Sequence, residues 1–201
     1  MISNYIFDFG NVLAQFSPDK LTAPYVTDEK VRKYISEIVF DRKYWDKLDR
    51  GTITDDEVKA EISRRIPADM QEVALKVYDN WIENLIPVKN MERLIFDIHK
   101  TNKRLYLLSD ISIGFAKRYR DVEWVKKLFE CFDGLVFSGV VGIVKPNKEI
   151  FEYLLTLYDL KADECLFVDD NLNNIEGAKA VGISGYLFDG DAIKLRNYLR
   201  I

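Results

Sequence analysis

The chain has 201 residues, 48% of them hydrophobic and 31% charged, which is enough for one good core with a small insert. The 29 Lys and Arg residues and the 33 Asp and Glu residues give a net charge of −4, so we expect neither a nucleic acid nor a membrane as a partner. No apolar run has the length of a signal sequence or of a membrane span, and we therefore expect a cytoplasmic protein.

The first strand-like segment ends in a carboxylate. Tyr5, Ile6 and Phe7 form a continuous apolar run, which is typical of a strand buried on both faces of a parallel sheet, and Asp8 follows directly. An ionised Asp is tolerated there if it emerges at the carboxyl edge of the sheet, where ligands of open α/β sheets bind, and meets a cation. For a single strand, an Asp that merely caps the next turn would be the more common explanation.

The segment at residues 15–87 has helical periodicity. Helices are expected at residues 19–25, 28–40, 41–48, 54–65 and 69–85. We therefore predict a small helical cap domain at residues 15–87, inserted into a core domain formed by residues 1–14 and 88–201. Several aromatic residues of this insert have helical spacing, which favours packing in its core over stacking on a sugar: Tyr34, Phe40, Tyr44, Trp45, Tyr78 and Trp81.

Strands alternate with helices in the rest of the chain. The strand-like runs are residues 104–109, 134–138, 164–169 and 184–188, and the segments between them and at residues 192–199 are helical. This alternation predicts right-handed βαβ units. The expected fold class is therefore α/β, with a Rossmann-like parallel sheet that carries helices on both faces.

Two further polar side chains stand where strand-like or extended segments meet a helix. Ser109 ends an apolar run, and a hydroxyl with free backbone N–H groups at such a junction forms a corner that binds anions. Lys145 precedes Pro146, which favours an extended backbone that aims the ammonium, while the proline can open a helix at residues 147–157. Taken alone, Ser109 would more often be a helix cap and Lys145 a solvated surface residue.

A pair of carboxylates, Asp169 and Asp170, closes the apolar run at residues 165–168. Together with Asp8 they place acidic groups at the ends of two strands. Because parallel strands deliver these groups to one edge, the sequence predicts a hard-oxygen site that suits Mg²⁺, which takes one or two carboxylates plus phosphate oxygens and waters.

Histidine and cysteine contribute little to the expected chemistry. His99 falls in a periodic helix, where a solvated residue is expected. Because it is the single histidine of the chain, a histidine-based hydrolase or a zinc site is close to excluded. Cys131 and Cys165 lie far apart without the spacing of a metal or redox pair, so we expect reduced thiols.

Four motifs follow one another along the chain, around Asp8, Ser109, Lys145 and the pair Asp169-Asp170. In this order they resemble the haloacid dehalogenase superfamily, in the subgroup with a helical cap inserted after the first motif. The similarity covers essentially the whole chain. The segments FDFGNVL, DRGTIT, KP and FVDDNLNNIEGA further resemble bacterial phosphatases that act on α-D-glucose 1-phosphate. The resemblance implies that Asp8 is the nucleophile and that Ser109 and Lys145 hold the phosphate. It makes Asp170 the main metal carboxylate, with Asp169 an additional one near the metal or its waters.

Gly10 is the one clear departure from the family pattern. Most phosphatases of the superfamily carry an Asp there, two residues after the nucleophile, as the general acid and base. The family uses the backbone carbonyl of this residue as a metal ligand, which Gly10 could still supply. Gly10 cannot supply a proton, and general acid catalysis typically raises the rate by ~10²–10⁴. The substrates should therefore be narrowed to those whose leaving group departs readily.

The resemblance thus implies a Mg²⁺-dependent phosphatase that hydrolyses a small phosphorylated metabolite through an aspartyl-phosphate intermediate. A sugar phosphate is expected as substrate, with a sugar 1-phosphate favoured. Arg42, between two cap helices, and Asp110, beside Ser109, are further candidates for substrate contact. A metal-independent haloacid dehalogenase and a non-catalytic phosphometabolite-binding protein remain open as alternatives. The sequence leaves the oligomeric state undetermined, with a monomer as the expectation.

Overall fold

A parallel sheet forms the centre of the larger half of the molecule. The computed structural model describes residues 2–201, and its five-stranded sheet has the order β5-β4-β1-β6-β7. The strands, all paired in parallel, are β1 (Asn4–Phe7), β4 (Arg104–Ser109), β5 (Gly134–Phe137), β6 (Cys165–Asp169) and β7 (Ser184–Leu187). The predicted α/β fold class is confirmed, and the most apolar runs form the central strands because both of their faces are covered.

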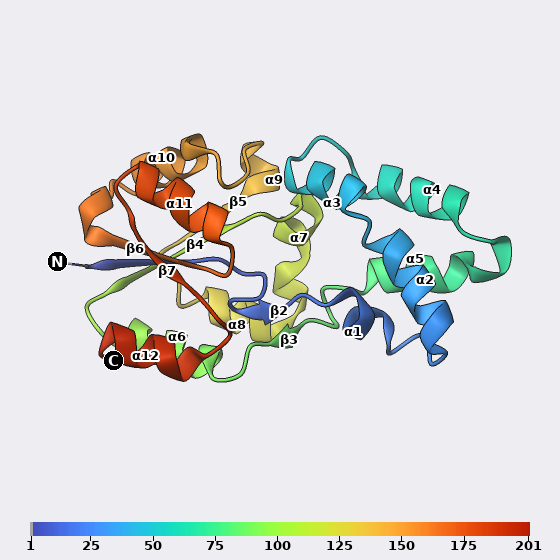
Figure 1. The fold of residues 1–201 in the computed structure, drawn as a ribbon, viewed down its shortest axis with the longest axis horizontal. Helices are drawn as coiled ribbons and strands as arrows, with labels where there is room; N and C mark the ends of the chain where they lie inside the picture. Colours follow the sequence, from blue (N-terminus) through green and yellow to red (C-terminus); the bar gives the residue numbers. More distant parts are fainter. Residues whose placement is uncertain (1) are drawn as a thin grey trace.

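Helices lie on both faces of this sheet (Figure 1). One face carries α10 (Lys148–Leu157) and α11 (Leu172–Ala180), and the other carries α6 (Met91–His99), α8 (Glu123–Phe129) and α12 (Ala192–Leu199). Side chains alternate accordingly along β1, since Ile6 packs in the core under α10 and α11 whereas Tyr5 and Phe7 pack in the opposite layer.

A helical insert forms the smaller half of the molecule (Figure 1). Its helices are α1 (Pro18–Thr22), α2 (Glu29–Val39), α3 (Arg42–Asp49), α4 (Asp55–Arg65) and α5 (Gln71–Asp79). The Thr54 hydroxyl accepts a hydrogen bond from the Glu57 amide at 3.2 Å, which is part of a capping box at the start of α4. Both connections to the core belong to a short antiparallel pair, β2 (Ala14–Gln15) with β3 (Ile86–Pro87).

Some predicted helix limits are wrong. The segment at residues 69–85 is not one helix, because a 3₁₀ turn (Ala68–Met70) precedes α5 and the chain turns after Asp79 to bury Trp81 and Leu85. Pro146 does not open a helix either, since α10 begins two residues later at Lys148 with Asn147 as its N-cap.

The remaining elements join the strands of the core. They are α7 (Ile113–Arg118), α9 (Ser138–Val141) and two 3₁₀ turns (Tyr119–Asp121 and Ala162–Glu164). The short helix α9 packs against α3 and α7, so it lies where the core meets the insert.

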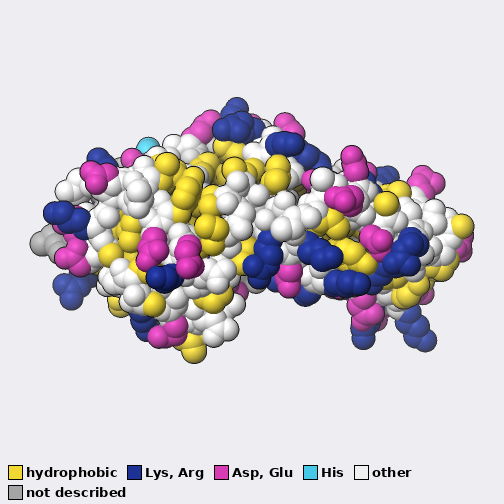
Figure 2. Space-filling model, turned by 90° about the horizontal axis from the view of Figure 1, so that it is seen from above, with side chains coloured by type: hydrophobic (Ala, Val, Ile, Leu, Met, Phe, Trp, Pro, Cys, Tyr) yellow, Lys and Arg dark blue, Asp and Glu magenta, His cyan; other side chains and the backbone are white. Residues whose placement is uncertain are grey.

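Charged side chains of both signs are scattered over the face seen in Figure 2, among hydrophobic and uncharged groups. Among residues 2–201, none of the helices has the length and apolar character needed to cross a bilayer. Both cysteines are free and buried, as predicted, and His99 is exposed at the end of α6.

Candidate active site

The candidate site is a cavity of about 340 Å³ between the carboxyl edge of the sheet and the insert. Its volume lies at the lower end of the range for small-molecule pockets. The core lines it with Asp8, Phe9, Gly10, Asn11, Ala14, Ser109, Asp110, Ile111, Lys145, Asp170, Asn171 and Asn174, and the insert lines it with Phe16, Arg42, Trp45, Asp49, Trp81 and Leu85. The ends of β1, β4 and β6 meet here because the three strands are adjacent and parallel.

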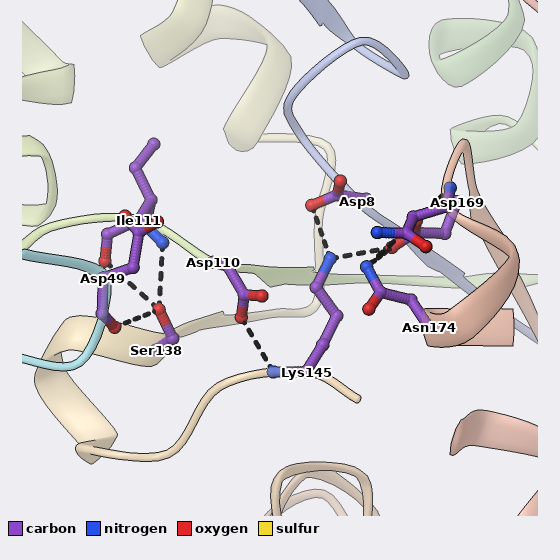
Figure 3. A network of polar contacts seen from close by, with 9 residues as sticks. Asp8, Asp49, Asp110, Ile111, Ser138, Lys145, Asp169 and Asn174 are labelled. Atoms are coloured by element: carbon purple, nitrogen blue, oxygen red, sulfur yellow. Dashed lines mark hydrogen bonds and ion pairs between the residues drawn. The ribbon is translucent and has the colours of Figure 1, made fainter. Parts of the chain in front are cut away.

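Lys145 connects two carboxylates at the floor of the cavity (Figure 3). Its Nζ lies 2.8 Å from Asp8 Oδ1 and 2.8 Å from Asp169 Oδ2, and its side chain is only 1% exposed. The loop that carries it is held by a hydrogen bond of 3.0 Å from the Lys145 amide to Asp110 Oδ1. The lysine is therefore a fixed buried cation rather than a surface residue.

Asp169 is fully buried and already has a complete set of hydrogen bonds. Its Oδ1 accepts from the Asn171 amide at 2.7 Å and from Asn174 Nδ2 at 3.2 Å, while its Oδ2 accepts from Lys145 Nζ and from Asn174 Nδ2 at 3.1 Å. Asp170 differs, because it is exposed and lines the cavity. The two adjacent carboxylates thus have separate tasks: Asp169 orients Lys145, and Asp170 is open to a ligand.

The electrostatics of the floor favour a bound cation. Burial raises the pKa of Asp8 to about 7, although Lys145 lowers it. Burial opposes the charge on Lys145, but the surrounding carboxylates, Asp8 first, raise its pKa. Burial also raises the pKa of Asp170. One ammonium therefore faces more carboxylates than it can neutralise, and a divalent cation would relieve this imbalance.

The donor set fits a metal ion. Oxygen atoms of Asp8, Asp169 and Asp170 lie within 4.8 Å of one another. The carbonyl oxygen of Gly10 accepts no hydrogen bond from residues 2–201, although its neighbours in the turn do. An all-oxygen group of this kind suits Mg²⁺ or a similar hard cation rather than zinc.

Ser109 and Asp110 lie beside this floor at the end of β4. Ser109 is 2% exposed, and its hydroxyl has no hydrogen-bond partner within residues 2–201 while it lines the cavity. It does not cap the following helix, because Ser112 is the N-cap of α7 and accepts from the Phe115 amide at 3.1 Å. The alternative role of Ser109 as a helix cap is therefore wrong, and its hydroxyl is free for a ligand.

The insert contributes an aromatic wall and one cation. Trp45 and Trp81 pack with ring centroids 5.1 Å apart, and both contact Phe16. The indole N–H of Trp45 donates to the Val39 carbonyl at 2.8 Å, which fixes the ring. Arg42 stands at the rim, where its exposed guanidinium pairs with Asp46 at 2.5 Å. The six aromatic residues named in the sequence analysis are thus mostly core, as expected, but Trp45 and Trp81 also line the cavity, together with Phe16.

Asp49 is the residue that sequence reasoning missed. It ends α3, is 9% exposed and lines the cavity. A signal was present, because Asp49 lies four residues after Trp45 on the buried face of α3, where an acidic residue is unexpected.

Comparisons with known proteins agree with this geometry. A family model described as haloacid dehalogenase-like hydrolase matches residues 2–182. A sesquiterpene phosphatase of Aspergillus oryzae is 28% identical over 182 residues, which are 90% of this chain and 86% of that protein. A D-ribitol-5-phosphate phosphatase of Bacteroides thetaiotaomicron is 25% identical over 195 residues, covering 92% of this chain and 91% of that protein.

Solved structures share the fold. A HAD family enzyme of Bacteroides thetaiotaomicron, in complex with magnesium and inorganic phosphate, has a TM-score of 0.72 at 22% identity, covering 97% of this chain and 99% of that one. An L-2-haloacid dehalogenase of Xanthobacter autotrophicus has a TM-score of 0.67 at 16% identity, covering 92% of this chain and 76% of that one. With the family match over most of its length and the four motifs meeting at one cavity, this chain belongs to the haloacid dehalogenase-like hydrolase family.

Proposed function

We propose that this chain is a Mg²⁺-dependent phosphatase that hydrolyses a small phosphorylated metabolite through an aspartyl-phosphate on Asp8. The observation that carries the proposal is the floor of the cavity. There Lys145 fixes Asp8, and the open carboxylate of Asp170 has an oxygen within 4.8 Å of it. The relatives named as phosphatases support the same reaction class.

The proposed attack uses Asp8 as the nucleophile. Lys145 holds Oδ1, so the carboxylate is oriented before substrate arrives and Oδ2 is left to attack phosphorus. Water then cleaves the aspartyl-phosphate and restores the carboxylate.

Two groups of the chain would neutralise the phosphoryl oxygens. Two of the three N–H bonds of Lys145 are directed at carboxylates, which leaves the third for a phosphoryl oxygen. The free hydroxyl of Ser109 is the second donor. Positioning and charge neutralisation of this kind account for most of the catalysis of phosphoryl transfer.

A magnesium ion would be held by Asp8, Asp170 and the Gly10 carbonyl, with Asp169 near its waters. When bound, it stabilises negative charge on the transferring phosphoryl group. The solved relative with magnesium and inorganic phosphate supports this choice of ion.

The proposed substrate is a sugar phosphate, with a sugar 1-phosphate favoured. Gly10 supplies no acid at the position where most relatives carry one. The oxygen of an anomeric leaving group needs a proton less than that of a primary alcohol does, so a sugar 1-phosphate depends least on an acid from elsewhere in the cavity. The cavity of about 340 Å³ supports a small substrate, with Arg42 at the rim and the aromatic wall of Trp45 and Trp81 against the leaving group. The relative named for ribitol 5-phosphate supports a polyol-like leaving group, although that compound is the ester of a primary alcohol and lends no support to the anomeric preference.

A substrate screen tests this proposal against its alternatives. Purified protein is assayed with sugar 1-phosphates, sugar 6-phosphates, 4-nitrophenyl phosphate and 2-chloropropionate, with Mg²⁺ and with chelator. Phosphate release that chelator abolishes and that Asp8→Asn removes is the expected result. Chloride release that survives chelation would indicate a dehalogenase instead. Phosphate binding without turnover of any compound would indicate a phosphometabolite-binding protein.

A further inference from the structure

The carboxyl of Asp49 has no assigned task in this mechanism. Its side chain makes no hydrogen bond or ion pair with residues 2–201, although the residue is 9% exposed. It lines the main cavity and a smaller adjoining one. A buried carboxyl without a partner costs stability, so its presence on a cavity wall calls for a ligand or a reaction.

The end of α3 that carries Asp49 is fixed to the core. The Ser138 hydroxyl donates to the Asp49 carbonyl at 2.6 Å and accepts from the Ile111 amide at 2.9 Å (Figure 3). Next to it, a Cβ on Gly139 would stand 3.0 Å from the Leu48 carbonyl oxygen, so the two backbones touch. Asp49 thus belongs to the insert in sequence but is positioned by the core, as a catalytic group must be.

In-line transfer determines where a proton donor must stand. Asp8 attacks from the sheet edge, so the leaving oxygen departs on the opposite side, toward the insert. The insert lines the cavity with Phe16, Arg42, Trp45, Asp49, Trp81 and Leu85, and Asp49 is the one carboxylic acid among these. A guanidinium cannot release its proton near neutral pH. Asp110 also lines the cavity, but it stands on the core side, where its Oδ1 accepts from the Lys145 amide.

From this placement we infer that Asp49 is the general acid and base of the reaction, taking over from the insert the task that Gly10 cannot perform. The inference rests on the proposed phosphatase function. As Asp8 Oδ2 bonds to phosphorus, the bond from phosphorus to the leaving oxygen breaks and the Asp49 carboxyl transfers its proton to that oxygen. The Asp49 carboxylate then takes a proton from the water that attacks phosphorus, while the bond to Asp8 breaks and phosphate leaves.

The surroundings of Asp49 keep it protonated in the required range. Burial, and then the Asp110 carboxylate, raise the pKa of Asp49 to about 7. On its own helix Arg42 lowers this pKa and Asp46 raises it, and from the core Lys145 lowers it. The residue also ends α3, where the negative pole of the helix disfavours an anion. The packed helix α9 brings no charged side chain.

The leaving group provides the test. A primary alkoxide needs a proton to depart and 4-nitrophenolate does not, so Asp49→Asn should lower kcat/KM for a hexose 6-phosphate by ~10²–10⁴ and hardly change it for 4-nitrophenyl phosphate. The ratio kcat/KM is used because it covers only the steps up to departure of the leaving group. Asp49→Glu should recover part of the loss. Asp56→Asn, on an exposed turn of α4, is the matched control and should change neither value.

The pH profile of the wild-type protein gives a second readout that needs no variant. For the hexose 6-phosphate, kcat/KM should fall above about pH 7, as the acid ionises, with a weaker fall for 4-nitrophenyl phosphate. The difference between the two pH profiles tests the role of Asp49 even if Asp49→Asn does not fold. Equal loss on both substrates, or no loss on either, would refute the role of Asp49 while leaving the phosphatase intact. A wild-type protein that turns over none of the phosphate esters of the substrate screen, sugar 1-phosphates included, would remove the proposed function and this inference with it.

Discussion

Replacement of Asp49 by Asn should stabilise the protein at neutral and alkaline pH while it impairs catalysis. The pKa of this carboxyl is raised from 3.8 to about 7, chiefly by burial. At about 1.36 kcal/mol per pKa unit, the charge costs the folded state about 4 kcal/mol above pH 7. Burial of an unpaired Asn amide would cost about 1–3 kcal/mol. The expected net gain is therefore about 2 kcal/mol at pH 8.

The sign of this effect depends on pH. Because the folded state has the higher pKa, it binds more protons than the unfolded state between about pH 4 and 7, and the wild-type protein loses stability as pH rises through that window. The gain of the variant should therefore be close to zero at about pH 5 and complete at about pH 8.

Thermal unfolding of both proteins measures the gain. For a chain of this size, about 2 kcal/mol corresponds to a rise in Tm of about 4–8 °C. A purely structural Asp49 would behave in the opposite way, with a less stable variant. A gain that is the same at both pH values, or a lower Tm at pH 8, would refute the reasoning.

Three further substitutions follow from the floor of the cavity. Lys145→Met leaves Asp8 and Asp169 buried without a cation, so it should lower the free energy of unfolding, measured in urea, by about 3–5 kcal/mol. The control Lys148→Met, at an exposed site, should change the free energy of unfolding by less than about 0.5 kcal/mol. Asp170→Asn should leave Tm unchanged, because the side chain is exposed. The variant should raise the Mg²⁺ concentration for half-maximal activity at least ~10-fold. An unchanged metal requirement would remove Asp170 from the metal site. Gly10→Asp is free of steric conflict, because a Cβ there meets nothing within 4 Å. When it is added to Asp49→Asn, the double variant should regain activity on the hexose 6-phosphate, by up to ~10²–10⁴ relative to Asp49→Asn alone. If the folded double variant regained no activity on the hexose 6-phosphate, the loss in Asp49→Asn would not be due to a missing acid.

The floor of the site could be predicted from the sequence because it depends on local order. Asp8, Ser109 and Asp169 end apolar runs, and parallel pairing alone brings such ends to one edge. The different roles of Asp169, which orients Lys145, and Asp170, which is open to a ligand, could not be predicted from the apolar run that precedes them. It follows from the buried position of Lys145, which lies 24 residues before Asp169 in the chain.

The insert side of the cavity could not be predicted in the same way. Whether an aromatic residue of a helix faces the core of the insert or the cavity depends on how the insert packs on the sheet, and Trp45 and Trp81 do both. The pair β2–β3 was missed because strands of two residues have no detectable period. Asp49 was missed because its burial depends on Ser138, a residue 89 positions away.

The touching backbones near Gly139 also limit how closely the two halves of the molecule can approach each other. The insert is joined covalently only through β2–β3, and the contact of α3 with α9 lies across the junction from that pair (Figure 1). A Cβ at Gly51 would stand 2.3 Å from the Gly139 carbonyl oxygen, so the gap is already at its minimum. These two glycines therefore allow α3 to lie this close to the core. An alanine at either position would act as a wedge, and engineering for bulkier leaving groups would begin there.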